Sequence, residues 1–509
     1  MFEAMRALGL VAAPQALAVP DFRSPSVGDL NAAQRGKHVV ILGAGIAGLA
    51  TAYEFGKAGY RCTVLEAKDR VGGRNWTVRG GTSETDLDGH AQTARFANGH
   101  YLNAGPARLP QSHITLDYCR ELGIPIEPFI NQNANALIYN EQTGAPVQQY
   151  RTAKADVYGY VSELLAKALD QGALDQELSA ADKDRLLTFL SGFGAIGDKA
   201  DGFAYRGTDR RGYRVEPGAA DQAGEVLGPP PSLREVLASQ VGRYFSFEFG
   251  YDQAMAMFQP VGGMDAVPMA LHRAIGADKI RLGAEVTRIT DLPGRVEVGY
   301  RDKRGTEQLV TADFCVATLP PHIMARIPTN LDPRVAAALR FPTVNPVGKI
   351  GLEYRRRWWE EDARIYGGIT ETDMDLAHIW YPSYGFQGQR GVVVGYYNTG
   401  KNATTYGSLA PAQRIDRAVA QGAKIHGATY RDELVSAFSV AWHRTPFIEG
   451  GWVDWPSRTS GEYALLNQPA GRVYFAGDWL SYFIAWQAGA FDSARYAVTN
   501  IHNRVRAGG

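Results

Sequence analysis

Short apolar runs alternate with amphipathic segments over much of this chain, and the first clear example lies near its amino end. Residues 38–42, "HVVIL", form an apolar run of the length typical of a buried strand. The segment from Ile46 to Gly59 has helical spacing and ends on a glycine, which is a helix-stop signal. Residues 61–66, "RCTVLE", form a second strand-like run. The pattern predicts a strand, a helix and a second strand, the start of a parallel α/β sheet.

A different pattern, with apolar residues three or four positions apart, predicts helices between residues 150 and 255. "ADVYGYVSELLAKALDQG" has this spacing, and two capping boxes are predicted, at Ser179 with Asp182 and at Ser232 with Glu235. Residues 202–231 are rich in glycine, proline and charge. They predict a long surface loop that either covers a tunnel mouth or is a connector without a role. Strand-like runs such as "VGKIGLEY" and "GVVVGYY" return in residues 341–440.

The first twenty residues are apolar but include Glu3, and predict an amphipathic helix with Met1, Met5 and Leu8 on one face rather than a signal peptide. No run of about eighteen apolar residues occurs, so no membrane span is predicted. We expect a cytoplasmic protein, and leave open an export leader upstream of this sequence.

The composition of the 509 residues narrows the possible functions. This length predicts two or three domains. Lysine plus arginine and aspartate plus glutamate both number 53, so there is no basic field to hold nucleic acid. An odd number of cysteines, three, favours buried thiols in a reducing compartment. The histidines and cysteines show no metal-binding spacing, and no G-x-S-x-G nucleophile elbow is present.

The turn after the first strand carries the strongest chemical signal. Gly43, Gly45 and Gly48 follow in the order G-x-G-x-x-G, and Glu66 lies eighteen residues after Gly48, at the end of the second strand. Such glycines let backbone N–H groups approach a pyrophosphate at a helix N-terminus. A terminal acid accepts both ribose hydroxyls and repels a ribose phosphate. The arrangement therefore predicts dinucleotide binding.

A second glycine turn distinguishes among dinucleotides. Gly72 and Gly73 are followed by Arg74, where a nicotinamide enzyme would normally enter another helix. The turn predicts a longer ligand whose pyrophosphate gains a charged partner in Arg74. The alternative is a surface loop with a solvated arginine.

These stretches resemble the flavin-containing amine oxidases, the family of monoamine oxidases, polyamine oxidases and L-amino-acid oxidases. "GRVYFAGDWLSYFIAWQAGAFDSARYAV", from Gly471 to Val498, resembles the carboxyl-terminal flavin motif of that family. "QPVGGMDAVPMAL", "IRLGAEVTRI" and "ADFCVATLPP" resemble its middle portion. The resemblance covers the chain except for the first thirty-odd residues and part of the central insert, and is closest to the L-amino-acid oxidases.

The resemblance implies an α/β fold with a discontinuous Rossmann-like FAD-binding domain, a mixed-sheet substrate domain and a helical insert. The FAD domain would use residues 36–90, 258–340 and 445–509. The substrate domain would use 91–149 and 341–444, the insert 150–257, and residues 1–35 would be an N-terminal extension. The implied cofactor-binding residues are Gly43, Ala44, Gly45, Ile46, Ala47, Gly48, Glu66, Ala67, Gly72, Gly73, Arg74, Gly105, Pro106, Ala107, Arg108, Val286, Gly477, Asp478, Ala485, Trp486, Gln487 and Ala488. No cysteine lies between Gly471 and Gly509, so the FAD is expected to be non-covalent.

The resemblance also implies the residues that bind the substrate carboxylate. In L-amino-acid oxidases the arginine of a "GPxRLP" stretch grips it, and here that residue is Arg108. A guanidinium offers a planar fork that matches a carboxylate. The resemblance places Tyr396 of "VVVGYYN" beside the carboxylate as the second contact. If that strand alternates, Val392, Val394 and Tyr396 share a face and Tyr397 points the opposite way. A structural arginine paired with an acid and a core tyrosine are the alternatives.

Three more residues would complete the catalytic site by resemblance. Lys349 would hold a water near the reactive nitrogen of the flavin, Trp486 would form one wall beside the ring, and Ala485 would offer its carbonyl to the substrate amine. A surface lysine and ordinary core packing of the tryptophan are the alternatives. Aromatic residues that would line an apolar pocket favour bulky hydrophobic or aromatic substrates, namely Trp380, Tyr381, Tyr482 and Trp486.

The expected activity is that of an FAD-dependent L-amino-acid oxidase. It would transfer hydride from Cα to flavin and yield a 2-oxo acid, ammonia and, with dioxygen, hydrogen peroxide. A decarboxylating monooxygenase and a plain amine oxidase are alternatives within the family, and a redox-silent flavin-binding scaffold is an alternative outside it. The family resemblance also implies a homodimer.

Overall fold

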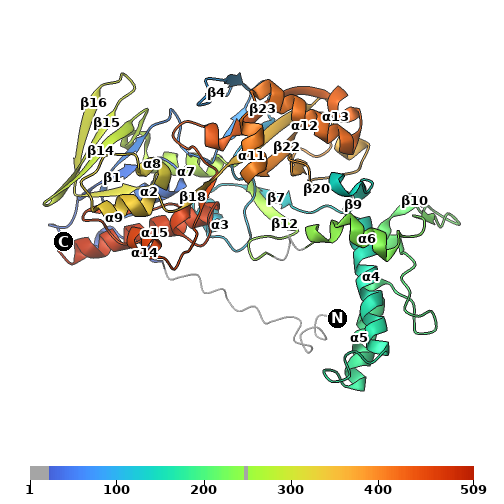
Figure 1. Ribbon diagram of the computed structural model, residues 1–509. Coiled ribbons are helices and arrows are strands. Elements are labelled where there is room, and N and C mark those ends of the chain that lie inside the picture. The colour runs from blue at the N-terminus through green and yellow to red at the C-terminus, as the bar shows by residue number, and fades with distance from the viewer. Residues whose placement is uncertain (1–21, 246–249, 509) are drawn as a thin grey trace. The chain divides into compact units, whose positions relative to one another are not determined.

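The computed structural model describes residues 22–245 and 250–508, and the helix predicted for the first twenty residues lies outside them. The chain divides into two compact units, each assembled from segments that are far apart in the sequence (Figure 1). The first unit comprises the chain up to Gly73 together with Pro268–Thr343 and Asp454–Gly509. The second comprises Arg74–Val267 and Val344–Val453.

A five-stranded parallel sheet forms the centre of the first unit, in the order β13-β2-β1-β17-β25. Its strands are β1 (His38–Leu42), β2 (Arg61–Glu66), β13 (Ile280–Leu282), β17 (Phe314–Ala317) and β25 (Val473–Phe475). All five residues of β1 are buried, as expected of an apolar strand with neighbours on both edges.

Helix α2 (Ile46–Lys57) connects β1 to β2 and packs against α15 (Gln487–Arg506), so segments more than 400 residues apart in the sequence lie side by side in this unit (Figure 1). An antiparallel sheet of β14 (Glu285–Leu292), β15 (Arg295–Arg301) and β16 (Glu307–Ala312) is inserted before β17. The remaining helices of the unit are short: α8 (Pro321–Met324), α9 (Pro333–Leu339) and α14 (Gly461–Leu466).

The second unit is built on a seven-stranded mixed sheet in the order β23-β19-β22-β21-β20-β8-β9. Only the β20–β8 pair is parallel among these strands. Their bounds are β8 (Leu137–Tyr139), β9 (Gln148–Gln149), β19 (Val347–Tyr354), β20 (Ile369–Thr372), β21 (His378–Trp380), β22 (Gly391–Thr399) and β23 (Leu434–Ala441). Every residue of β19 is buried, so this strand lies within the core of the unit.

Smaller pairs of strands surround this sheet. They are β3 (Thr77–Arg79) with β6 (Tyr101–Asn103), β4 (Ser83–Thr85) with β5 (Ala91–Thr93), β7 (Ile126–Ile130) with β12 (Ala256–Pro260), and β10 (Tyr213–Val215) with β11 (Glu225–Val226). The helices are α3 (Thr115–Glu121), α4 (Tyr150–Asp170), α5 (Ala180–Gly194), α6 (Leu233–Ser239), α10 (Trp358–Glu361), α11 (Gly400–Gly407), α12 (Pro411–His426) and α13 (Thr429–Asp432). Helix α7 (Ala266–Ile275), β18 (Thr343–Asn345) and β24 (Trp452–Asp454) span the boundaries between the units.

The predicted helices of the insert are confirmed, but of the two predicted capping boxes only the one at Ser232 is reciprocal. Ser179 accepts a hydrogen bond from the Asp182 N–H at the start of α5, and Ser232 forms a reciprocal capping box with Glu235 at α6. A Cβ on Gly159 of α4 would lie 2.3 Å from the Tyr205 ring, so glycine is needed there to seat that ring. The predicted surface loop at 202–231 contains the β10–β11 pair.

The predicted α/β fold class, with a parallel Rossmann-like sheet and a separate mixed sheet, is confirmed. The second unit begins at Arg74, whereas the sequence places the end of the first FAD segment at residue 90. Strand β3 explains the earlier boundary, because it pairs with β6 of the second unit.

Candidate functional site

The glycine turn after β1 brings backbone against backbone. Gly43 has a φ of 97°, in the region that favours glycine. A Cβ on Gly48 would lie 2.0 Å from the Gly43 carbonyl oxygen, so no larger residue fits there without moving the turn. A Cβ on Gly45 would meet nothing within 4 Å. The turn is therefore closed on its inner side and open beside Gly45, which fits a ligand lying against the backbone.

The second glycine turn lies alongside the first. Gly72 donates a backbone hydrogen bond of 2.7 Å to the Ala44 carbonyl, and Gly45 and Gly72 form a parallel bridge. Gly73 has a φ of 56°. The structure thus brings these two predicted turns together into one surface of main chain, which we call the glycine cradle (residues 43–48, 72 and 73).

Glu66 lies at the edge of this cradle. Its carboxylate accepts hydrogen bonds from the backbone N–H groups of Ala44, at 2.7 Å, and Lys68, at 2.9 Å. Burial raises the pKa of this carboxyl. Each carboxylate oxygen has two lone pairs, so both retain capacity to accept a ribose hydroxyl.

The carboxyl-terminal motif forms a second polar turn in the same unit. Asp478 is buried and accepts a hydrogen bond of 3.0 Å from the Ala485 N–H. Ala485 has a φ of 67°, a strained conformation for alanine. Trp486 is the N-cap of α15, so Gln487 and Ala488 are its first residues and their N–H groups lie at its positive end. The N–H groups of Gln487 and Ala488 suit an electron-rich edge of a flavin or its phosphates.

Arg108 and Asn131 form the polar centre of the second unit. The Arg108 side chain is buried and donates a hydrogen bond of 2.8 Å to Asn131 Oδ1. Its guanidinium carbon lies 4.7 Å from the centre of the Trp380 ring. Burial lowers the pKa of Arg108 to about 10. Asn131 Nδ2 is buried and has no hydrogen-bond partner among the described residues. The pair therefore offers amide and guanidinium donors in a water-poor environment.

Lys349 lies beside the same tryptophan. Its Nζ donates hydrogen bonds to the carbonyl oxygens of Gly105, at 2.5 Å, and Asn103, at 3.4 Å. It is also 4.8 Å from the ring centres of both Trp380 and Tyr397. Burial, and secondly the charge of Arg108, lower the pKa of Lys349 to about 7. A lysine in this setting exchanges its proton near neutral pH. We call Arg108, Asn131, Lys349, Trp380 and Tyr397 the cation cluster.

The alternation predicted for β22 is wrong, and a β-bulge is the reason. Ile350 pairs with Tyr396 and Gly351 pairs with Val394, so Gly395 is the extra residue. Beyond the bulge, each side chain of β22 lies on the face of the strand opposite to the one that simple alternation predicts. Val392, Val394 and Tyr397 share one cluster of side chains. Tyr396 belongs to the core on the other face and packs against Tyr406, with ring centres 4.3 Å apart. The charge of Arg108 acts on Tyr397, so Tyr397 rather than Tyr396 lies on the side of the strand that faces the guanidinium.

The other predicted residues are distributed over both units. In the second unit, a Cβ on Gly105 would lie 1.8 Å from the Arg74 carbonyl oxygen, and Arg74 donates to the Gly451 carbonyl at 2.6 Å. Pro106 and Ala107 connect Gly105 to Arg108. In the first unit, Val286 is half-buried on β14, and Ile46, Ala47 and Ala67 are in or next to the cradle elements.

The four aromatic residues predicted to line an apolar pocket have different surroundings within their own units. Trp380 belongs to the cation cluster. Tyr381 lies in the core, where its hydroxyl is 2.7 Å from Thr370 Oγ1 and 2.8 Å from His426 Nε2. Tyr482 is 71% exposed. Asn131 was not predicted, because a lone asparagine after a strand carries no motif.

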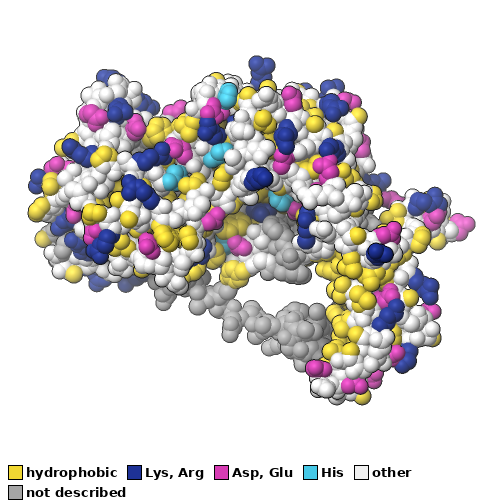
Figure 2. Space-filling view, viewed as in Figure 1, with side chains coloured by type: hydrophobic (Ala, Val, Ile, Leu, Met, Phe, Trp, Pro, Cys, Tyr) yellow, Lys and Arg dark blue, Asp and Glu magenta, His cyan; other side chains and the backbone are white. Residues whose placement is uncertain are grey.

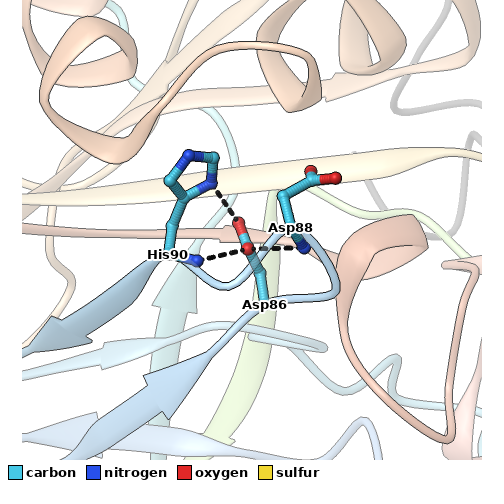
Figure 3. Close-up of side chains that lie close together, drawn as sticks. All are labelled: Asp86, Asp88 and His90. Atoms are coloured by element: carbon cyan, nitrogen blue, oxygen red, sulfur yellow. Dashed lines mark hydrogen bonds and ion pairs between the residues drawn. The ribbon is translucent and has the colours of Figure 1, made fainter.

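One further group of polar side chains resembles a metal site, among the residues that the structure describes. Asp86, Asp88 and His90 lie within reach of one another (Figure 3). Asp86 Oδ1 accepts from the backbone N–H groups of Asp88 and His90, at 3.0 and 2.9 Å. Arg414 pairs with Asp86 and Arg444 with Asp88. The hydrogen bonds within the turn and these two arginines thus provide partners for both carboxylates.

Comparison with known proteins identifies one family over most of the chain. A family described as flavin containing amine oxidoreductase matches residues 46–502. An L-amino-acid oxidase of Protobothrops flavoviridis is 28% identical over 478 residues, covering 92% of this chain and 89% of its own. A putative L-amino-acid oxidase of Bacillus subtilis strain 168 is 27% identical over 482 residues, covering 91% of this chain and 94% of its own.

Solved structures with the same fold are less similar in sequence. Cyclohexylamine oxidase from Brevibacterium oxydans has a TM-score of 0.62 at 19% identity, covering 92% of this chain and 99% of its own. Putrescine oxidase bound to putrescine has a TM-score of 0.61 at 19% identity, with the same coverage. No helix in residues 22–245 or 250–508 is long and apolar enough to cross a membrane.

Proposed function

The chain belongs to the family of flavin-containing amine oxidoreductases, and from this premise we propose that it is an FAD-dependent L-amino-acid oxidase. Its substrates would be hydrophobic or aromatic L-amino acids, and its products a 2-oxo acid, ammonia and hydrogen peroxide. The two relatives named as L-amino-acid oxidases support this activity over the oxidation of plain amines.

The observation that carries the proposal is the buried pair of Arg108 and Asn131. A carboxylate entering beside them would meet the guanidinium fork and the Asn131 Nδ2 donor, which has no partner among the described residues. Charge-assisted hydrogen bonds of this kind are strong where water is excluded. A plain amine has no group to accept them, and would leave the buried Asn131 Nδ2 donor without a partner among the described residues. The pair therefore favours an amino acid over the corresponding amine.

Trp380 and Tyr397 would orient the rest of the substrate. The Trp380 ring is flanked by both cations and stands perpendicular to Tyr397, with ring centres 5.0 Å apart. The Tyr397 hydroxyl would donate to the substrate carboxylate, while the rings contact an apolar side chain. When bound, the flavin supplies the electron acceptor for amine oxidation and passes the electrons to dioxygen. The chain's own contribution is positioning and exclusion of water.

Lys349 would bind and release a proton after the substrate amine has been oxidised. Because its pKa is lowered to about 7, it is able both to hold and to release a proton at Nζ near neutral pH. We propose that it orients a water for hydrolysis of the imino acid, or assists reoxidation, and these two steps are separable by kinetics.

The glycine cradle would hold FAD without a covalent bond. Its backbone N–H groups suit a pyrophosphate and Glu66 suits a ribose. The absence of cysteine from residues 471–509 supports a dissociable flavin. A homodimer and a reducing compartment are further parts of the proposal, and light scattering and cell fractionation test them.

A peroxide assay with the twenty amino acids, in parallel with the corresponding amines, tests the proposed function. We expect peroxide with leucine or phenylalanine, little with the amines, and a 2-oxo acid as the organic product. An amide product would establish a decarboxylating monooxygenase. Equal rates with amines and amino acids would establish a plain amine oxidase, and no turnover of any substrate would establish a redox-silent scaffold.

A further inference from the structure

A cavity of about 320 Å³ lies in the helical insert of the second unit. Helix α4 forms one wall, through Tyr150, Lys154 and Tyr158 among others, and the end of α5 forms another through Phe193. Figure 2 shows hydrophobic side chains gathered over this pair of helices. The size is that of a small-molecule site rather than a packing defect.

Three cationic side chains are among the described residues that line the cavity. Arg151, Lys154 and Arg210 line it, and none of its described lining residues is acidic. The Arg151 guanidinium is exposed and forms no hydrogen bond or ion pair with the described residues. Arg210 donates to the carbonyl oxygens of Phe193 and Gly192 at the end of α5, which uses two of its five N–H groups. The local field therefore selects an anion.

The wall of the cavity is aromatic. The Tyr158 and Phe193 rings stack with centres 4.7 Å apart, and Lys154 Nζ lies 5.5 Å from the ring centres of both Tyr150 and Tyr158. Ala155 and Met255 add apolar surface. A largely apolar wall with cations at its border favours an aromatic body with one charged group over a multiply charged phosphate.

The cavity is distinct from the cation cluster, although one segment of chain serves both. Asn131, the partner of Arg108, is followed directly by Gln132, which lines the cavity. The backbone N–H groups of Asn131 and Gln132 both donate to the Met255 carbonyl, at 2.8 and 3.2 Å. Neither Arg108 nor Lys349 is among the lining residues.

We propose that this cavity is a second binding site, for an aromatic carboxylate, with the carboxylate held by Arg151 and its neighbouring cations and the ring against Tyr158 and Phe193. The proposal goes beyond the proposed oxidase activity and does not depend on it.

Calorimetric titration of the full-length protein with indole-3-acetate tests the site, because this probe has an aromatic ring and a carboxylate but no amine to oxidise. The Arg108→Ala variant is the background, since it removes the carboxylate site proposed for catalysis. We expect this variant to bind one molecule per chain. Adding Arg151→Glu should weaken that binding about tenfold or more, and adding Ala155→Trp, which fills the cavity without changing charge, should abolish it. Tryptamine, with a cationic chain, should not bind.

Arg185→Glu is the matched control, because Arg185 is an exposed cation on α5 that does not line the cavity. It should leave the affinity unchanged. No binding to Arg108→Ala, or equal binding after both cavity substitutions, would overturn the proposal. Failure of the oxidase assignment has a different signature: the wild type and Arg108→Ala would then bind the same single molecule.

Discussion

The two units hold their candidate sites with different parts of the polypeptide. In the first unit the glycine cradle is made of main chain, and Gly48 matters because it has no side chain to collide with the Gly43 carbonyl. In the second unit the cation cluster is made of side chains, with Arg108 and Lys349 buried around one tryptophan. A main-chain site is changed by adding atoms, whereas a side-chain site is changed by removing charge. The two sites are therefore expected to fail separately.

Replacing Arg108 should have the largest effect on substrate. Breaking a desolvated guanidinium–carboxylate pair costs roughly 2–5 kcal/mol, so Arg108→Ala should raise KM for amino acids by about tens to thousands of fold. The flavin spectrum should be retained, because the cradle is untouched. Steady-state kinetics on yellow protein measures this. Arg108→Lys, which keeps the charge without the fork, should recover part of the loss, and an unchanged KM in the alanine variant would remove Arg108 from the site.

Replacing Lys349 should change stability in a pH-dependent way. Its folded-state pKa is lowered from 10.5 to about 7, so between these values the unfolded chain binds a proton that the folded protein does not. Folding stability of the wild type therefore rises with pH across this window. The free energy of unfolding of Lys349→Met minus that of the wild type should therefore fall by about 1 kcal/mol per pH unit from neutral toward alkaline pH.

Denaturant unfolding at several pH values measures this slope. The slope is the informative quantity, because the methionine also leaves the Gly105 and Asn103 carbonyls without their donor. The exposed residue Lys401 provides the control, since Lys401→Met removes a lysine that is not buried. Parallel stability curves for the wild type and Lys349→Met would show that Lys349 is charged or exposed at neutral pH.

Adding one methyl group to the cradle should reduce flavin affinity without altering substrate selectivity. The Cβ of Gly48→Ala would lie 2.0 Å from a carbonyl oxygen, so the turn must shift, and overpacking of about 1–3 kcal/mol corresponds to about fivefold to 150-fold weaker binding. Gly56→Ala in the same helix is the matched control, because its Cβ meets nothing within 4 Å. Fluorescence titration of each apoprotein with FAD measures the two affinities. Equal affinities for Gly48→Ala and Gly56→Ala would contradict the proposed role of the glycine cradle.

The smallest effect is expected from two neighbouring tyrosines. Tyr397→Phe should raise KM several-fold by removing one hydrogen bond of about 1 kcal/mol to the carboxylate. Tyr396→Phe should leave KM unchanged, because Tyr396 packs against Tyr406 on the other face of the strand. A raised KM for Tyr396→Phe together with an unchanged KM for Tyr397→Phe would contradict this, and would support simple alternation along the strand without the bulge at Gly395.

The difference between the sites also explains what the sequence reveals. The cradle depends on glycine spacing within one turn and on an acid at the end of the next strand, and both are local. Gly43, Gly48 and Glu66 were therefore predicted in their places. Arg108 and Lys349 were also named, through the family resemblance, and the structure brings both to Trp380.

The remaining details of the cation cluster depend on contacts that are distant in the sequence. A bulge is invisible in the run "VVVGYYN", because an extra residue leaves no trace in composition, and it exchanges Tyr396 for Tyr397. Asn131 follows β7 without any motif, and its role is visible only once Arg108 lies 2.8 Å away. The early start of the second unit at Arg74 likewise depends on pairing between β3 and β6.

The most direct test of a carboxylate-selective flavin enzyme is the visible spectrum of the purified protein under anaerobic conditions. Phenylalanine and phenethylamine differ only by the carboxylate that Arg108 and Asn131 are proposed to bind. We predict that phenylalanine bleaches the flavin absorbance rapidly, whereas phenethylamine at the same concentration does so slowly or not at all. Equal bleaching by both compounds, or a spectrum that stays oxidised with phenylalanine and leucine, would contradict it.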